Sequence, residues 1–178
     1  MSTEYVAGFI VGFLLVFVAI FVVRMIVSKK LGGVPTGKCN FDERQELVRG
    51  KAFKYGFFTM MACNIILGFG PDILEVELPM ANSVAMFLSL AIGLVVFASY
   101  AIWNEGYFSL NERPKSMMIL FGFIAVVNTI SAIMNYHQGK MFADGKLTFF
   151  AMNAVCAGMF VLIFIVLFAK SIARKHED

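Results

Sequence analysis

The sequence predicts an all-α integral membrane protein, a bundle of five transmembrane helices with the N-terminus outside and the C-terminus inside. Hydrophobic residues make up 60% of the 178 residues and charged residues only 15%, whereas soluble domains are about a quarter charged. The apolar residues gather into stretches of about the 20 residues that a helix needs to cross a bilayer. Lysine and arginine gather between particular stretches, and this asymmetry predicts the orientation.

Four apolar stretches are long enough to span by themselves, at residues 6–27, 80–102, 116–135 and 147–169. A fifth, at residues 55–71, is shorter, but the snorkelling stems of Lys51 and Lys54 extend it to a span at about residues 52–71, and it has no charged face to hold it on the surface. We expect the first stretch to be a retained span, because a stop-transfer pattern of basic residues follows it. The chain is thus predicted to form one membrane domain, with inner segments at residues 28–51, 103–115 and 170–178.

The distribution of basic residues favours the N-out, C-in orientation. It places 13 of the 15 lysines and arginines on the inner side and leaves only Lys140 and Lys146 outside. The opposite orientation would reverse this ratio. The net charge of +3 then reflects a basic inner border beside the lipid headgroups, and we expect no nucleic-acid partner.

Residues 40–58, NFDERQELVRGKAFKYGFF, pass from charged to apolar without an intervening proline. Asp42 is a favourable N-cap, and Gln45 lies three residues later, where its side chain completes a capping box. Cations follow toward the headgroups, which attract them. We therefore expect the second span to extend into the cytosol as a helix.

A second charged segment, WNEGYFSLNERPK at residues 103–115, is predicted on the same side. Two interpretations remain open: the charges only cap and solubilise the helix, or opposite charges of the two segments pair and form one composite cytosolic surface. Arg44 or Arg49 would then meet an acid of the second segment. The candidate interaction surface comprises Asp42, Glu43, Arg44, Gln45, Arg49, Lys51, Trp103, Glu105, Glu112 and Arg113.

The stretches FDERQELVRGKAFKYGFF and IWNEGYFSLNERP resemble those of a family of small multi-pass membrane proteins from Clostridia-like bacteria. The run D-E-R-Q…R-G-K-A-[FY]-K-Y is the most specific part of the likeness, which extends over most of the chain. The resemblance implies a protein of the bacterial cytoplasmic membrane. It implies no activity, cofactor or functional residue.

The predicted spans lack the ionisable residues that membrane enzymes and ion-coupled transporters place at depth. The two histidines, His137 and His176, fall in an outer loop and in the C-terminal segment. No HExxH or Walker A motif is present, and the three cysteines show no metal-ligand or redox spacing. We therefore expect no enzyme activity, no cofactor and no metal site. The prolines at 71, 79 and 114 are expected at span ends, so that no span is broken.

Small residues recur every four positions in several spans, a pattern that lets helices approach closely in lipid. Ala81, Ala85, Ser89 and Gly93 form such a ladder in the third predicted span, which we expect at the centre of the bundle. Weaker pairs are Ala52 with Gly56 and Ala154 with Gly158. Gly8 and Gly12 in the first span would serve either packing within the chain or a dimer interface.

Polar side chains within the spans form a second candidate site. An unpaired amide in hydrocarbon costs several kcal/mol, so these groups must face protein or water. They predict either hydrogen bonds between helices or a polar pocket. The residues are Asn64, Asn128, Ser131, Asn135 and Asn153.

Two functions are compatible with this sequence. The first is a non-enzymatic binding or regulatory module that acts through its cytosolic face, and we favour it. The alternative is a small oligomeric transport-related protein that uses the polar stripe of the fourth span. Besides the lipid bilayer, the candidate partners are a cytosolic protein and a second copy of the chain.

Overall fold

Long apolar helices account for most of the chain that is described by the computed structural model, residues 41–109 and 114–177. The longest helix has 32 residues and begins in the charged stretch that the sequence analysis expected to be helical. The elements are, in order, α2 (Glu43–Leu74), α3 (Asn82–Trp103), α4 (Pro114–His137), β1 (Phe142–Ala143), β2 (Lys146–Leu147), the 3₁₀ helix η1 (Phe149–Ala151) and α5 (Met152–Glu177).

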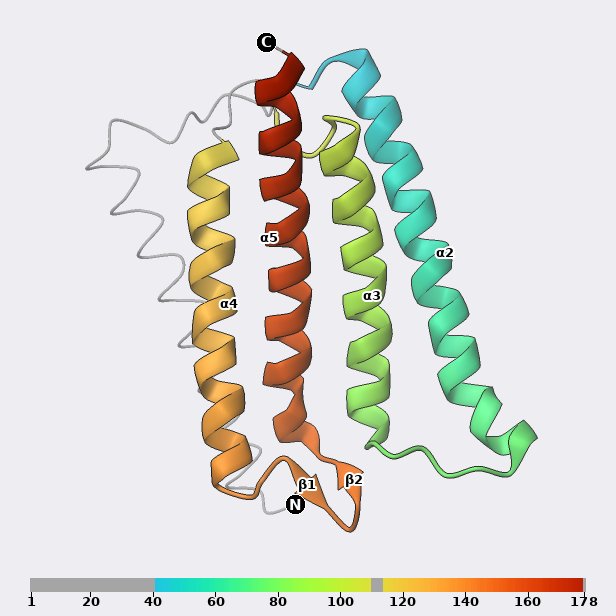
Figure 1. Cartoon of the computed structure of the whole chain (residues 1–178). Coiled ribbons are helices and arrows are strands. Elements are labelled where there is room, and N and C mark those ends of the chain that lie inside the picture. The colour runs from blue at the N-terminus through green and yellow to red at the C-terminus, as the bar shows by residue number, and fades with distance from the viewer. Residues whose placement is uncertain (1–40, 110–113, 178) are drawn as a thin grey trace, which may run out of the picture. The chain divides into compact units, whose positions relative to one another are not determined.

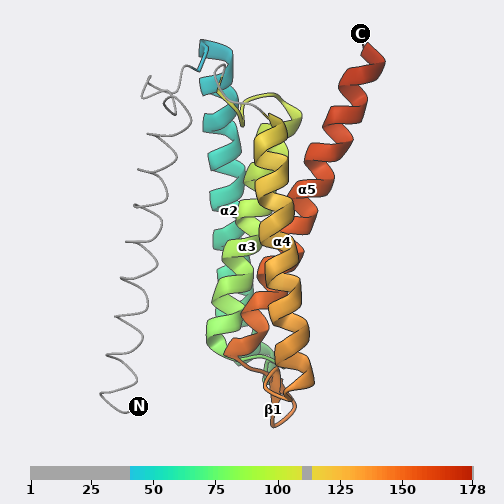
Figure 2. The same cartoon turned by 90° about the vertical axis from the view of Figure 1, so that its left-hand side faces the viewer.

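Successive helices run in opposite directions, and each packs beside one or two others. α3 lies between α2 and α5, and α5 lies between α3 and α4 (Figure 1). The start of α2, the end of α3, the start of α4 and the end of α5 lie at one end of the bundle, which we call the ion-pair end. The opposite end, called the hairpin end, carries the strands β1 and β2 (Figure 2).

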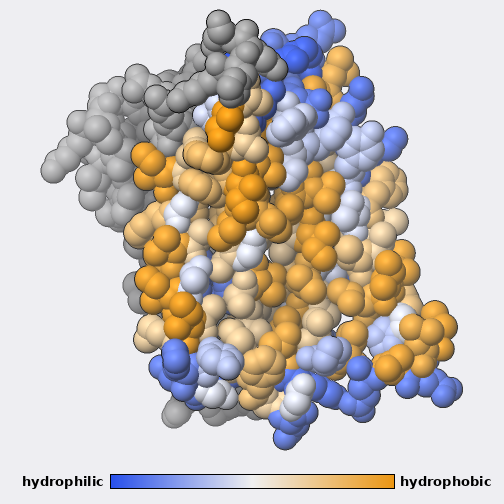
Figure 3. All heavy atoms as spheres, viewed as in Figure 1, coloured by the Kyte–Doolittle hydropathy of each residue, from blue (hydrophilic) through white to orange (hydrophobic). Residues whose placement is uncertain are grey.

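All four helices are long and apolar enough to cross a membrane. In the space-filling view an apolar band covers the middle of the helices, and hydrophilic residues gather toward both ends (Figure 3). Large apolar side chains such as Ile66 and Ile119 point outward, as expected where lipid is the solvent. These features fit a multi-pass membrane protein. The first predicted span, residues 6–27, lies outside the described residues.

Helix boundaries differ from the prediction at three places. Pro71 lies inside α2, which continues to Leu74, so the expectation that proline would end this span is wrong. Its carbonyl still accepts the N–H groups of Glu75 and Val76, and these bonds close the turn beyond it. The last span begins at Met152 rather than at 147, because Lys146 and Leu147 form a strand, and its helix continues through the segment expected to follow the span.

A short hairpin fastens the connection between α2 and α3. Asp144 and Gly145 have φ angles of 50° and 73°, which are the positive values that a two-residue type I′ turn requires. The N–H of Leu147 then donates to the carbonyl of Pro79, and its carbonyl accepts from the N–H of Ala81. The hairpin therefore acts as an anchor for the loop that precedes α3.

α2 and α3 come into contact at Gly56 and Gly93, where neither helix has a side chain. A Cβ added to Gly93 would lie 2.9 Å from the carbonyl oxygen of Gly56, and one added to Gly56 would lie 2.9 Å from that of Gly93. Ala85 and Ser89 of the predicted ladder are also buried, so the expectation of close packing along α3 is confirmed for the described helices. The pair Ala154 and Gly158 is exposed, and the weaker pattern there does not mark a contact within the described residues.

The apolar core lies between α3 and α5, nearer the ion-pair end. Its buried residues are Ala98, Ile102, Ile163 and Leu167, with Phe121 of α4 and aromatic residues of the loop after α3 packed against them. The interior position expected for the third predicted span is thus shared by α3 and α5. This core supports the loop that forms the candidate site.

Candidate binding surface at the ion-pair end

The start of α2 is held by the capping box that the sequence predicts. The N–H of Gln45 donates to Oδ1 of Asp42 at 2.6 Å, and the N–H of Asp42 donates to Oε1 of Gln45 at 3.2 Å. Each side chain satisfies a backbone donor that the helix start leaves without a partner. The prediction of a capped helix start is confirmed.

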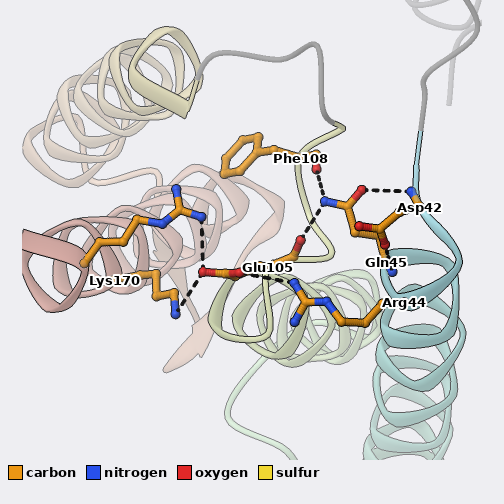
Figure 4. Close-up of polar contacts among 7 residues, drawn as sticks. Asp42, Arg44, Gln45, Glu105, Phe108 and Lys170 are labelled. Atoms are coloured by element: carbon orange, nitrogen blue, oxygen red, sulfur yellow. Dashed lines mark hydrogen bonds and ion pairs between the residues drawn. The ribbon is translucent and has the colours of Figure 1, made fainter. Parts of the chain in front are cut away.

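Gln45 also connects α2 to the loop after α3, a role that the sequence analysis did not assign to it. Its Nε2 donates to the carbonyl oxygens of Glu105 at 3.0 Å and Phe108 at 3.2 Å (Figure 4). The residue is buried, with 7% of its surface exposed. Since both ends of the amide are bonded, this side chain fixes the distance between helix and loop without leaving a buried polar atom unpaired.

The loop leaves α3 through a Schellman motif. The N–H of Gly106 donates to the carbonyl of Ala101, and the N–H of Glu105 donates to that of Ile102, which is the pattern that closes many helix ends. Glu105 takes the left-handed position of this motif, with φ of 63°, where glycine is the usual residue. A glutamate that accepts this backbone strain is a signal that its side chain has a role.

The carboxylate of Glu105 binds cations from two helices (Figure 4). Oε2 lies 3.2 Å from Nη2 of Arg44, at the start of α2. Oε1 lies 3.1 Å from Nη2 of Arg174 and 3.5 Å from Nζ of Lys170, both near the end of α5. We call these four residues the Glu105 cluster. It ties together three segments that are more than sixty positions apart in the sequence.

The charges of this cluster do not balance, because one carboxylate meets three cations. The hydrogen bond from Arg174 is the main cause that lowers the pKa of Glu105, with a smaller contribution from Arg44. The side chains of Arg44 and Arg174 are 63% and 58% exposed. Each guanidinium has five N–H donors and uses Nη2 on Glu105. The cluster therefore presents surplus positive charge and further donors to solvent.

The loop is pressed against its neighbours on both sides. A Cβ added to Gly106 would lie 2.5 Å from Cγ1 and 2.9 Å from Cβ of Val48 in α2, so only glycine fits there. On the other side the ring of Tyr107 packs against Phe97 of α3 and Phe121 of α4, each with centroids 6.3 Å apart. These contacts hold the loop against α2 on one side and against α3 and α4 on the other.

The contact predicted between the two charged segments is present, since Arg44 pairs with Glu105. Arg49 does not join it, and its guanidinium lies 4.0 Å from the centre of the Phe41 ring instead. Glu43 and Lys51 are exposed on α2, and Trp103 ends α3 with Lys170 Nζ 5.9 Å from its ring centroid. The remaining predicted members, Glu112 and Arg113, lie outside the described residues.

Lys170 and Arg174 belong to the surface, although they are not among the residues predicted to form it. The sequence predicts both on the inner side, in a segment 170–178 that is separate from the last span. The signal that would have identified them is their spacing of four residues, which puts two cations on one face of a helix that continues.

The polar residues within the membrane helices mostly bond to their own backbone. Asn64, Asn128 and Ser131 donate to carbonyls four residues earlier, at 2.9, 2.9 and 3.0 Å. Among the described residues these three side chains therefore bond within their own helices, and the choice between helix–helix hydrogen bonds and a polar pocket stays a prediction. Asn135 donates to another element, the carbonyl of Phe150 in η1, at 3.2 Å. Asn153 lies half-buried in the first turn of α5.

A cavity of about 540 Å³ opens between α2 and α3 at the hairpin end. Asn64 lines it together with Asp72, Asn82 and the ion pair of Glu77 with Lys146. The positive charge and hydrogen bond of Lys146 lower the pKa of Glu77. Among the described residues, no group of three or more His, Cys, Asp or Glu is arranged to hold a metal ion.

Comparisons with known proteins identify no relative of this chain. No protein-family model matches the chain, and neither the curated proteins nor the solved structures contain a significant match.

Proposed function

We propose that this chain is a non-enzymatic protein of the bacterial cytoplasmic membrane that binds a cytosolic protein through its ion-pair end. In this proposal the chain has five spans and is oriented N-out, C-in, so that the Glu105 cluster faces the cytosol. The basic residues support this orientation, because among the described residues the hairpin end carries Lys140 and Lys146 whereas the ion-pair end carries the larger group of cations.

The observation that carries the proposal is the junction of three segments at Glu105. It displays Arg44, Arg174 and Trp103 as exposed side chains on a fixed support. Arginine and tryptophan are the residues most often found to dominate protein–protein binding. A loop that is already held in place by packing loses little backbone conformational entropy on binding. The start of α2 is therefore better described as a docking surface than as a solubilised helix start.

The polar stripe gives less support to the alternative, a transport-related function. Asn128 and Ser131 each donate a hydrogen bond to a carbonyl of their own helix, so part of their hydrogen-bonding capacity serves the helix and not a passing solute. The stripe therefore fits a structural role in α4.

Site-specific photo-crosslinking in cells tests the proposal. A photoreactive amino acid replaces Leu47, which is 64% exposed on α2 near the cluster, and Phe142, which is 52% exposed at the hairpin end, serves as the matched control. We expect an adduct with a cytosolic protein at position 47 that is absent at position 142. Arg44→Glu should weaken that adduct while changing the melting temperature little, because exposed ion pairs contribute only ~0.2–1 kcal/mol. Identical adducts at both positions, or an adduct that Arg44→Glu leaves unchanged, would contradict the proposal.

A further inference from the structure

The Glu105 cluster resembles a phosphate-binding site in its composition, because three cations surround one carboxylate. Arg44 and Arg174 contact the carboxylate from opposite oxygens, and Lys170 lies beside Oε1. The cluster therefore retains two positive charges after Glu105 is counted. Guanidinium groups bind phosphate oxygens through paired N–H donors, and the side chains of both arginines are more than half exposed.

The position of the cluster identifies the source of the phosphate. It lies where apolar helices end, beside Trp103, which is 54% exposed at the last position of α3. Tryptophan at such a position sits at the level of the lipid headgroups. Basic pockets between transmembrane helices on the cytoplasmic side are where anionic headgroups bind.

We infer that the Glu105 cluster binds the phosphate of an anionic phospholipid of the inner leaflet, held by Arg44 and Arg174. The lipid site rests on the proposed function for the orientation of the ion-pair end toward the cytosol, and its regulatory consequence rests on the proposed protein partner as well. Glu105 holds the two arginines on either side of its carboxylate before the lipid arrives. A lipid phosphate and a protein partner then compete for the same guanidinium donors, so that the anionic lipid content of the membrane regulates the docking surface.

The fluorescence of Trp103 reports lipid binding at this site, because Trp103 is the only tryptophan of the chain. The full-length protein is reconstituted in nanodiscs of phosphatidylcholine with increasing phosphatidylglycerol, and either lipid is brominated on its acyl chains to quench Trp103. We expect phosphatidylglycerol to quench at a lower mole fraction than phosphatidylcholine. Arg44→Gln and Arg174→Gln should each lower this preference about fivefold, the equivalent of ~1 kcal/mol per juxtamembrane cation.

The matched control removes the same charge from the same end of the bundle. Lys54 is exposed on α2 and carries no ion pair among the described residues, so Lys54→Gln should leave most of the preference intact. If Lys54→Gln and Arg44→Gln lose the preference equally, the attraction of the lipid is general and the site does not exist. Should Arg44→Gln or Arg174→Gln fail to fold, Arg44→Lys with Arg174→Lys replaces them, and we expect a weaker preference from loss of the paired donors.

A second arm distinguishes lipid from soluble phosphate. Inorganic phosphate is added to nanodiscs that contain phosphatidylglycerol, at constant ionic strength matched with chloride. Quenching should remain unchanged, whereas recovery of Trp103 fluorescence by phosphate alone would assign the site to a soluble anion and overturn the lipid assignment. The assay contains no partner protein. Loss of the crosslink at Leu47 with retained lipid preference would therefore reject the proposed partner only, and the reverse result would reject only the lipid site.

Discussion

Glu105 occupies a position where its backbone is strained and its side chain is indispensable to three contacts. A left-handed conformation costs a residue with a Cβ roughly 1–2 kcal/mol, and glycine would avoid this cost. The carboxylate offsets part of the cost by pairing with Arg44, Lys170 and Arg174. Because the pairs are largely exposed, their net contribution to stability is small. Their main effect is to orient the surface.

The lowered pKa of Glu105 predicts how this contribution depends on pH. A carboxyl whose pKa is lower in the folded protein than its reference value of 4.5 stabilises the fold at pH above that value. The stabilisation is lost as pH falls through the folded pKa. The melting-temperature difference between wild type and Glu105→Gln should therefore be present near neutral pH and disappear in acid. A difference that is constant across this range would show that the charge of Glu105 does not contribute.

Gly106 and Gly50 should respond in opposite ways to alanine. At Gly106 the new methyl group would overlap Val48, and such overpacking costs ~1–3 kcal/mol. At Gly50, inside α2, nothing lies within 4 Å, and alanine should stabilise the helix by about 0.5–1 kcal/mol. Thermal melting in detergent measures both. Equal melting temperatures for the two variants would contradict the close contact between α2 and the loop.

At the scale of elements, the crossing of α2 and α3 depends on Gly56 and Gly93. Leucine at Gly93 would meet Met60 and the backbone of Gly56, so that the helices must separate. We expect Gly93→Leu to lower the melting temperature more than Leu94→Ala, which shortens a half-exposed side chain. Gly68→Leu is the matched control, because this glycine of α2 has open space around it. Comparable losses for Gly93→Leu and Gly68→Leu would rule out a close crossing at Gly93.

The sequence predicts these helices well because hydrophobic length and small-residue spacing act locally. It also contains the signal for the hairpin, since Asp144 and Gly145 form the Asp-Gly pair that favours a type I′ turn. The predicted last span, however, begins at residue 147 and so overlaps the second strand of the hairpin. The ion-pair end of α5 differs from the prediction for a related reason. Apolar character stops near residue 169, whereas the helix continues to Glu177.

At the scale of the whole molecule, the sequence predicts which segments come into contact but not which atoms form the contacts. Topology and charge predict a contact between Arg44 and the segment of Glu105, and the structure contains it. The bond of Gln45 to two loop carbonyls depends on the path of the loop, which no periodic pattern encodes. Likewise, the sequence does not determine whether Asn128 donates to another helix or to its own, and in the structure it donates to the carbonyl of Ile124 in its own helix.

All of the functional proposals require the ion-pair end to face the cytosol, and thiol labelling of intact cells measures this directly. Single cysteines are introduced at Glu46, exposed near the Glu105 cluster, and at Ala143, exposed on the hairpin, in a protein whose three natural cysteines are replaced. A membrane-impermeant maleimide should label Ala143→Cys in intact cells and Glu46→Cys only after permeabilisation. Labelling of Glu46→Cys in intact cells would place the cluster outside and contradict the proposed function.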